Sequence, residues 1–515
     1  MTGSVPSASP GSKIDRMAAT GRRSGLCERR PLPYRPGMGL EATNRAGAAG
    51  RGRARRAVGR RSAAVAVVLA GSVGRCDVAV AQADENGIGP NSIATSLPEN
   101  GDPAGLRKWL AGRGVTFTSI YTSEVLGNVS GGLKRGAAYG GKFEFNTTVD
   151  LDRMAGLDGL TFYANAFQIH ESAGISRRFV GNFQTISAIE ALPSTRLSEL
   201  WLERKFADGT FGIRVGQLAA DSEFFIAGYS LPFIDSDWPA ITKQNLPSGG
   251  PAYPLAAPGI RVRWDPTPRW SVLAAIFDGD PAGRGTREAE VRNRTGTRFP
   301  LSDPAFLMQE AQYRYNQEPD GEGLAGIVRL GAWEHLARFD AQRFRSGDGE
   351  LPGSPAGQRR LAGNGGVYGI IDQQLYRPPG GNPNSGVTAF SRISASPSDR
   401  NPVGFYLDGG LLFTGLLPGR PADQVGATFL WSEISSDARS FDRRRAALAG
   451  RNLPVRDREI AFELSYVAQV RPGWTVQPDF QYIFQPGGHV SRSDSDPTVA
   501  IRDAVVVGLR TTIIY

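Results

Sequence analysis

From about residue 115 to the end of the chain, apolar and polar residues alternate with a period of two, which is the spacing of a β-strand. In residues 141–151, Phe143 and Phe145 share one face, and Lys142 and Glu144 share the other. The pattern predicts sixteen strands, three of which alternate poorly and are assigned partly by position. The expected spans are 114–124, 139–150, 160–170, 195–206, 210–218, 259–265, 269–277, 307–315, 324–333, 366–375, 387–395, 404–414, 424–433, 458–469, 473–484 and 504–515.

The connections between these strands fall into two classes. The joins after the even-numbered strands are short, for example Ala207–Gly209, Pro266–Pro268 and Val470–Pro472. The joins after the first, third, fifth, seventh, ninth, thirteenth and fifteenth strands are long, and only the eleventh departs from the rule. This alternation predicts an all-β, antiparallel transmembrane barrel of about 16 strands, with short periplasmic turns, long external loops and an apolar outer face.

Aromatic residues support a membrane barrel. They lie near the ends of predicted strands, as the interfacial girdle of such a barrel requires, at Trp270, Trp474, Tyr482 and Phe484. The last strand ends at Tyr515, and a terminal aromatic residue resembles the sorting signal by which the barrel-assembly machinery recognises outer-membrane proteins, although Phe is more usual there. A soluble β-sandwich is the alternative, and it explains neither feature.

The positive charge of the chain is concentrated at the N-terminus. The 515 residues carry a net charge of +9, from 59 basic and 50 acidic side chains. Residues 1–83 hold fifteen basic and four acidic residues, a net of +11, which leaves −2 for the rest. The charge is therefore a property of the N-terminal segment, and it gives no support for nucleic-acid binding by the remainder.

That segment has the three parts of a secretory signal peptide. Arginines crowd residues 51–61, an apolar run covers residues 62–73, and Ala81-Gln-Ala83 provides the small residues of a cleavage site. We expect cleavage near Ala83, with Ala81 as the second choice, and export to the bacterial outer membrane. A disordered basic arm on a cytosolic protein is the alternative, and it does not explain the Ala-x-Ala ending.

Composition excludes several other classes. The mean hydropathy is −0.27 and the body has no run of 18 apolar residues, so a helical membrane bundle is excluded. The chain has only 3 His and 2 Cys, and both cysteines, Cys27 and Cys76, precede the expected cleavage site. We therefore expect no metal, no cofactor and no disulfide. Residues 84–108 form a short periplasmic segment before the barrel of residues 109–515, too short for a plug domain.

Eight stretches resemble the carbohydrate-selective porin family, OprB. They occur in family order, and the ordered set is more specific than any one stretch. The resemblance implies an outer-membrane porin for facilitated diffusion of mono- or small oligosaccharides. The stretches are RVGQLAADSEFF (Arg214–Phe225), YPLAAPGIRVR (Tyr253–Arg263), AIFDGDP (Ala275–Pro281), YLDGGLL (Tyr406–Leu412), GLLPGR (Gly415–Arg420), QPDFQY (Gln477–Tyr482), PGG (Pro486–Gly488) and AVVVGLR (Ala504–Arg510).

Strand parity selects the side chains that would line the pore of such a barrel. If Leu200 and Leu202 face lipid, the alternate residues Glu199, Trp201 and Glu203 face the lumen, where an aromatic plate and planar polar groups suit weak sugar binding. A structural network of paired charges is the alternative for each residue, and a one-residue slip in register would reverse every assignment. The predicted pore-lining and substrate-binding residues are Glu199, Trp201, Glu203, Arg214, Arg261, Arg263, Glu310 and Arg314, with Met308, Gln312, Arg329 and Arg510 as further lumenal positions.

The longest predicted loop is the third external one, residues 219–258, and we expect it to fold inward and narrow the barrel. Its candidate constriction residues are Asp221, Glu223, Trp238 and Tyr253. The alternative is a surface lid over the barrel mouth.

Two rival functions remain open from the sequence. A general or anion-preferring porin would use the inward arginines, although the acidic loop opposes anions. An outer-membrane barrel enzyme would need a catalytic group at one rim, where His170 and His489 lie, but no Gly-x-Ser-x-Gly elbow is present. We therefore expect no enzyme. Sugars, outer-membrane lipids and lipopolysaccharide are the expected partners, and a homotrimer is one open oligomeric state.

Overall fold

The computed structural model describes residues 87–97, 101–170, 174–318, 321, 323–345, 357–379, 385–493 and 495–515. The described residues all belong to one compact unit, which lies within Val67–Tyr515. The signal peptide predicted within residues 1–83 lies outside the described residues. Within the described ranges, no helix is long and apolar enough to cross a bilayer.

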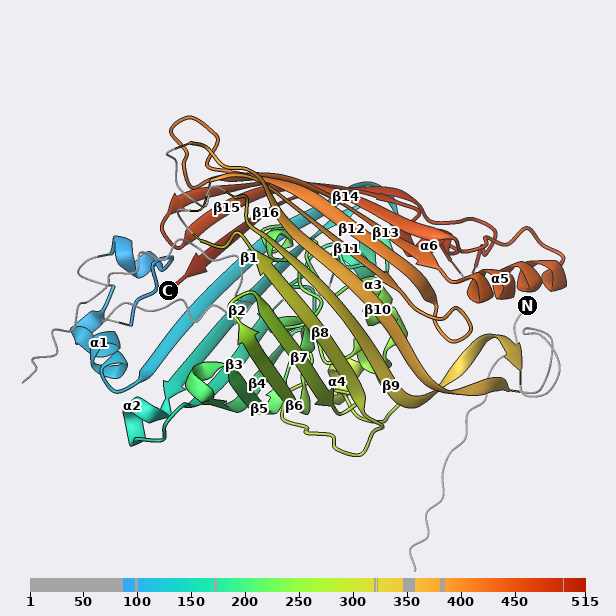
Figure 1. The fold of residues 1–515 in the computed structure, drawn as a ribbon. Coiled ribbons are helices and arrows are strands. Elements are labelled where there is room, and N and C mark those ends of the chain that lie inside the picture. The colour runs from blue at the N-terminus through green and yellow to red at the C-terminus, as the bar shows by residue number, and fades with distance from the viewer. Residues whose placement is uncertain are drawn as a thin grey trace, which may run out of the picture. The chain divides into compact units, whose positions relative to one another are not determined.

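Sixteen strands of the described chain form one closed antiparallel barrel (Figure 1). Each strand pairs with its neighbours in sequence, and β1 closes the barrel by pairing with β16. The predicted fold class is therefore confirmed. The strands are β1 (Val115–Gly132), β2 (Gly136–Asp150), β3 (Leu160–His170), β4 (Ser194–Phe206), β5 (Phe211–Leu218), β6 (Ala257–Thr267), β7 (Trp270–Phe277), β8 (Phe306–Tyr315), β9 (Gly326–Arg345), β10 (Gln358–Tyr376), β11 (Gly386–Ala395), β12 (Val403–Thr414), β13 (Gln424–Ile434), β14 (Arg458–Arg471), β15 (Trp474–Phe484) and β16 (Arg502–Ile514).

Short helices lie outside the strands. Ser435 caps α5, since its side chain accepts a hydrogen bond from the Ala438 N–H, and Gly450 ends the helix with a φ of 57°. The α-helices are α1 (Leu106–Ala111), α2 (Leu151–Ala155), α3 (Ala240–Asn245), α4 (Ala289–Arg292), α5 (Ser436–Ala449) and α6 (Pro486–His489); the other helical turns are η1 (Ile93–Ser96), η2 (Pro103–Gly105), η3 (Ile175–Val180), η4 (Ala207–Gly209), η5 (Ala220–Ser222), η6 (Gly228–Ser230) and η7 (Pro247–Gly249).

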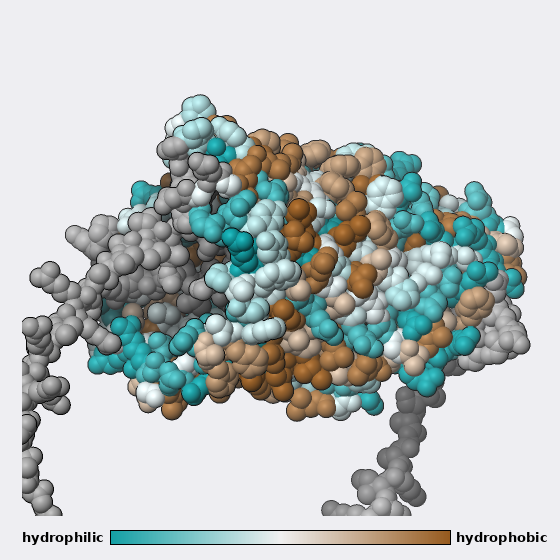
Figure 2. Space-filling model, in the orientation of Figure 1, coloured by the Kyte–Doolittle hydropathy of each residue, from teal (hydrophilic) through white to brown (hydrophobic). Residues whose placement is uncertain are grey.

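The wall of the barrel has an apolar outer face. On β4, Leu202 is 45% exposed and the next residue, Glu203, is 6% exposed, as strand parity predicts. Figure 2 shows hydrophobic residues gathered in a band over the strands, with hydrophilic residues toward both ends. Trp264 and Trp270 are exposed on either side of the short turn between β6 and β7, where a girdle is expected.

Several strands are longer than the sequence pattern predicts. The prediction of a long join after the first strand is wrong. The join between β1 and β2 covers only residues 133–135, although a long loop was expected there. Residues 125–132 hide the alternation because they include three glycines, yet Asn128 pairs with Gly136 and Gly132 pairs with Arg502. β9 and β10 also extend beyond their expected ends. Pairing with two neighbours therefore outweighs the weak local pattern.

The chain termini of the described unit meet at the end of the barrel that carries the short turns. The Arg107 guanidinium of α1 lies 4.3 Å from the ring centre of Phe117 and 4.2 Å from that of Tyr515. Tyr515 also donates a hydrogen bond of 3.2 Å to the Gly101 carbonyl. The N-terminal segment thus packs on the last residue of the chain, next to the closing pair β1 and β16.

Candidate functional site

Residues 219–256, which join β5 to β6, fold into the barrel. Phe224, Phe225 and Phe233 of this segment are at most 2% exposed, and they pack against the inward side chains of distant strands. We call this segment the inward loop. Its position agrees with the expected constriction and not with a surface lid.

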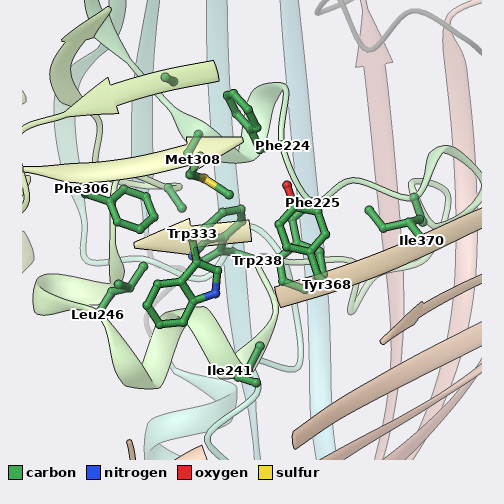
Figure 3. Close-up of a cluster of buried hydrophobic side chains, with 14 of the residues drawn as sticks. Phe224, Phe225, Trp238, Ile241, Leu246, Phe306, Met308, Trp333, Tyr368 and Ile370 are labelled. Atoms are coloured by element: carbon green, nitrogen blue, oxygen red, sulfur yellow. The ribbon is translucent and has the colours of Figure 1, made fainter. Parts of the chain in front are cut away.

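The inward loop packs on an apolar half of the inner wall, formed by β7 to β12. Phe225 stacks on Tyr368 with ring centres 4.1 Å apart, and Phe233 approaches Phe390 at 6.0 Å. Figure 3 shows Trp238, Ile241 and Leu246 of the loop gathered against wall residues of β8 to β10. Wall residues that share this cluster are Leu273, Phe277, Phe306, Met308, Trp333, Tyr368, Ile370, Phe390, Tyr406 and Leu412. Burial of these rings holds the loop against one side.

Four carboxylates of the wall fix the backbone of the same loop. Glu310 accepts a 3.0 Å hydrogen bond from the Phe225 N–H. Asp372 accepts from two consecutive amides at 2.8 and 3.1 Å, and Glu463 does the same at 2.7 and 2.8 Å. The amide donors are Ala219 for Glu199, Phe225 for Glu310, Gly228 and Tyr229 for Asp372, and Ile234 and Asp235 for Glu463. Each of these hydrogen bonds contributes roughly 0.5–1.5 kcal/mol, and six of them together fix the path of the loop.

A second loop, described over residues 174–193, is fixed in the same way. Glu459 accepts hydrogen bonds from the Phe183 and Gln184 amides at 3.0 and 2.9 Å. The Ala188 N–H donates to the Ile234 carbonyl at 2.8 Å and so joins this loop to the inward loop. Two external loops therefore occupy the lumen together.

Four of the predicted site residues form a closed ionic network at the start of the inward loop. Arg261 lies 2.9 Å from Glu203 and 2.7 Å from Glu223. Arg214 lies 3.2 Å from Glu203 and 3.3 Å from Glu223. All four side chains are at most 8% exposed, and the two charges of each sign cancel. These residues join β4, β5 and β6 to the loop and leave little surface for a solute.

Trp201 is covered on its ring by neighbouring side chains. Tyr163 stacks on it at 4.8 Å, and the Arg214 guanidinium lies 3.8 Å from the ring centre. The indole is 7% exposed. The sequence predicts Trp201 as a sugar contact between two carboxylates. In the structure, Tyr163 and Arg214 cover the ring surface that such a contact would use.

A cavity of about 290 Å³ lies between the inward loop and strands β2 to β4. Its lining includes four predicted residues, Glu199, Asp221, Trp238 and Tyr253. It adds side chains that the sequence analysis did not select: Lys142, Glu144, Tyr163, Asn165, Phe167, Phe225, Asp237 and Arg392. Aromatic rings and planar polar groups thus meet in one space, at the low end of the roughly 300–1,000 Å³ typical of small-molecule sites.

Charges of both signs stand around this cavity. Lys142 pairs with Glu144 at 2.9 Å, and its ammonium lies 4.8 Å from the Phe167 ring centre. Asp221 accepts a 2.7 Å hydrogen bond from the Tyr253 N–H. Burial raises the pKa of Asp221 to about 7. The carboxyl therefore changes its charge near neutral pH.

A small enclosed pocket lies between the inward loop and strands β6 to β9. Its space is about 10 Å³, and its lining includes Glu223, Arg263 and Arg314 from the predicted set, with Arg329 beside them. Arg263 pairs with Asp265 at 2.9 Å, and Arg314 donates to the Gln312 side chain at 2.6 Å. Arg329 pairs with Asp372 at 2.6 Å. The predicted residues are thus divided among a cavity, a small pocket, an ionic network and an anchor, Glu310.

The unselected lining residues carried partial signals in the sequence. Lys142 and Glu144 stand on the polar face of the clearest alternating run, so parity alone places them inward. Tyr163 and Asn165 belong to a strand that alternates poorly. Arg392 reaches the lumen from β11, where it pairs with Asp408 at 2.5 Å and donates to the Phe225 carbonyl at 3.3 Å. Its place at the cavity depends on the path of a loop that lies far away in sequence.

Comparison with known proteins agrees with this architecture. Residues 134–515 match the sequence model of the family described as carbohydrate-selective porin, OprB family. Porin B of Pseudomonas aeruginosa is 24% identical over 411 residues, which cover 75% of this chain and 87% of the relative. The high-pH structure of OprB from Pseudomonas putida has the same fold, with a TM-score of 0.71 at 23% identity over 80% of this chain and 97% of that chain. The chain belongs to the OprB family of carbohydrate-selective porins, channels of the bacterial outer membrane that pass carbohydrates.

Proposed function

We propose that carbohydrates cross this porin along the polar half of its inner wall, between the inward loop and strands β2 to β4. The observation that carries this proposal is the cavity of about 290 Å³ whose lining combines aromatic rings with planar polar groups. The ring of Phe167 suits the apolar face of a pyranose, while Asn165 and Glu144 suit its hydroxyls. Weak binding of this kind allows entry without slow release.

The inward loop acts in this proposal as a fixed partition. The apolar half of the wall and the carboxylate anchors hold it in place, and the remaining space is the path. Glu203, Arg214, Glu223 and Arg261 support the base of the loop, and they do not contact the sugar. Trp201 supports the same base through Arg214.

Single-channel conductance in a planar bilayer tests this path. Glucose and small oligosaccharides added on one side should reduce the current in a concentration-dependent manner, since an occupied cavity excludes ions. A sugar alcohol too long to enter the cavity serves as the osmotic control. A current that is indifferent to every sugar would reject the sugar site and would leave the barrel intact.

An anion-preferring pore is the second candidate, and the three arginines of the small pocket, Arg263, Arg314 and Arg329, favour it. The two candidates differ in reversal potential under a salt gradient. A strong chloride preference with no sugar block would favour the anion pore. Weak ion preference with sugar block would favour the carbohydrate path.

The route to the membrane is part of the proposal. Residues 1–83 direct export and are removed near Ala83, and residues 84–108 remain on the periplasmic side. The barrel-assembly machinery recognises the terminal residue Tyr515 during insertion. N-terminal sequencing of the purified outer-membrane protein tests the cleavage site. An N-terminus at Asp84 is the expected result, and an intact Met1 would reject it.

A further inference from the structure

The cavity beside the inward loop has more carboxylates than cations in its lining. A charge excess acts on a solute only where the charges are not already paired, because a close ion pair is nearly neutral from outside. The partner of each charged group therefore decides what the cavity attracts. The acidic side chains of the lining are Glu144, Glu199, Asp221 and Asp237, and the basic ones are Lys142 and Arg392.

Each cation at the cavity is matched by a carboxylate of its own. The pairs are Lys142–Glu144 at 2.9 Å, Arg392–Asp408 at 2.5 Å and, at the edge of the lining, Lys243–Asp237 at 2.7 Å. Arg214, the next cation toward β5, belongs to the closed ionic network with Glu203 and Glu223. These pairs cancel and leave two carboxyls of the lining, those of Glu199 and Asp221.

Glu199 and Asp221 each accept one backbone hydrogen bond. The Ala219 N–H donates to Glu199 at 3.1 Å, and the Tyr253 N–H donates to Asp221 at 2.7 Å. Among the residues that the structure describes, neither carboxyl forms an ion pair. Because Ala219 precedes Asp221 by two residues, both carboxyls belong to the same side of the cavity, and their negative charges repel each other. A cation placed between them removes that repulsion.

A buried amide oxygen of the same lining also lacks a partner. Asn165 is 3% exposed, and its Nδ2 donates to Glu144 Oε1 at 2.9 Å and to Asn146 Oδ1. Both N–H groups of this amide are thus in use, while Oδ1 has no hydrogen bond from any described residue. A buried acceptor without a donor costs free energy, so this oxygen favours a ligand that supplies a donor.

The hydroxyl groups of the lining do not supply that donor, since several donate within the protein. The donations are Tyr163 to the Asn146 side chain at 2.7 Å, Ser222 to the Ala219 carbonyl at 2.7 Å and Tyr253 to the Ile189 carbonyl at 2.9 Å. The unmatched groups of the cavity are therefore two carboxyls and one amide oxygen, and all three accept. An ammonium group complements them, because it donates three hydrogen bonds, accepts none and carries a positive charge.

We propose that this cavity prefers carbohydrates with a protonated amine, such as a 2-amino-2-deoxyhexose, to neutral hexoses, and that it disfavours sugars with a carboxylate. The inference rests on the proposed carbohydrate path and adds a substrate class to it. The ammonium binds Glu199 and Asp221, and another donor of the same sugar binds Asn165. A uronate brings a negative charge to the same carboxyls and is repelled.

Block of the single-channel current at neutral pH tests this preference. The probes are glucose, glucosamine, N-acetylglucosamine and glucuronate, and each charged sugar is compared with a matched concentration of salt. Glucosamine should reach half-block at about one-tenth of the concentration that glucose requires, since a hydrogen bond to a charged group is stronger than one between neutral groups. N-acetylglucosamine, whose nitrogen is uncharged, should resemble glucose, and glucuronate should block least.

Two isosteric variants remove the charges and keep the backbone contacts. Glu199→Gln and Asp221→Asn each retain an oxygen that accepts the amide hydrogen bond. Each should reduce the tenfold preference to about threefold, and the double variant should lose it while glucose still blocks. Glu124→Gln is the matched control, because it removes a carboxylate that pairs with Arg510 at 2.8 Å outside the cavity lining, and it should keep the preference. Heat-modifiable migration on a gel shows that each variant is folded.

Equal half-block by glucosamine and glucose in the unmodified protein would overturn the inference and leave the carbohydrate path in place, and this comparison needs no variant. A preference that survives in the double variant, or that Glu124→Gln reduces as much as Glu199→Gln does, would also overturn it. The selectivity would then belong to the charge of the lumen as a whole. A channel that none of the four sugars blocks would instead reject the carbohydrate path itself, and this inference with it.

Discussion

The two halves of the inner wall differ in what they hold. Strands β7 to β12 present Phe306, Met308 and Trp333 to the lumen, and the inward loop covers them. Strands β2 to β4 present Lys142, Glu144 and Asn165, and a cavity faces them. Porin lumens are expected to be polar. The difference shows that the inner face of the wall is polar where it faces water. The inner face is apolar on the side where a loop packs against it.

The contacts of the loop with the two halves also differ in kind. On the apolar half, aromatic stacking is supplemented by Glu310 and Asp372, which accept backbone amides. Away from the apolar half, the contacts with the loop backbone come from carboxylates: Glu463 accepts hydrogen bonds from two amides at 2.7 and 2.8 Å, and Glu199 accepts one at 3.1 Å. Removal of an apolar contact and removal of a carboxylate should therefore have effects of different size and character.

The largest effect is expected from Phe225→Ala. This change removes the ring that stacks on Tyr368 at 4.1 Å and should cost about 3–5 kcal/mol of unfolding free energy, as for other buried aromatic residues. The loop should then leave the wall, and the mean single-channel conductance should rise. The lipid-facing change Leu330→Ala is the control, and equal conductance in the two variants would contradict the proposed packing.

The next effect is expected from Glu463→Ala. Two buried amides, those of Ile234 and Asp235, lose their acceptor, at a cost of roughly 2–3 kcal/mol. We expect open-channel current noise to increase more than mean conductance, because the loop stays packed on its apolar side. Glu433→Gln, which changes a carboxylate paired with Arg439, should leave the noise unchanged. A quiet Glu463→Ala channel would show that the amides are satisfied in another way.

How much of this arrangement could be predicted from sequence depends on the range of the contacts. Period-two alternation predicts the barrel and the inward direction of Arg214 and Arg261, since it is a local property of each strand. Loop length singles out the segment that contains Asp221 and Trp238. The side on which the loop packs is decided by pairs such as Glu463 with Ile234, 229 residues apart, and no local pattern reports them.

Substitution of an aromatic residue that lines the cavity should weaken sugar binding, whereas substitution of a covered aromatic residue should not. This effect is smaller than those of the two loop variants. Phe167→Leu removes a ring from the cavity and should raise the sugar concentration for half-block by about three- to tenfold, since an aromatic contact is worth roughly 0.5–1.5 kcal/mol. Trp201→Phe keeps a ring beneath Arg214 and should leave half-block unchanged. Stronger weakening by Trp201→Phe than by Phe167→Leu would restore Trp201 as a sugar contact.

The smallest effect concerns pH. Burial raises the pKa of Asp221 to about 7, so its carboxyl is mostly charged at pH 8 and mostly neutral at pH 6. The cavity should lose negative charge, and the cation preference of the channel should fall, as pH decreases through 7. Burial also raises the pKa of Asp235, to about 6, but this residue does not line the cavity. Asp221→Asn should reduce, without abolishing, the pH dependence of the reversal potential between pH 8 and pH 6, because Glu199 is a second buried carboxyl of the same lining.

Cysteine accessibility tests most directly that sugars follow the polar half of the wall. The chain after residue 83 contains no cysteine, so single cysteines can be introduced without background. Lys142→Cys, on the polar half, should react with a charged, membrane-impermeant thiol reagent, and bound sugar should slow that reaction. Met308→Cys, on the apolar half and 1% exposed, should remain unreactive. Rapid labelling of Met308→Cys, with Lys142→Cys inert, would place the path on the opposite side of the loop and contradict the proposed function.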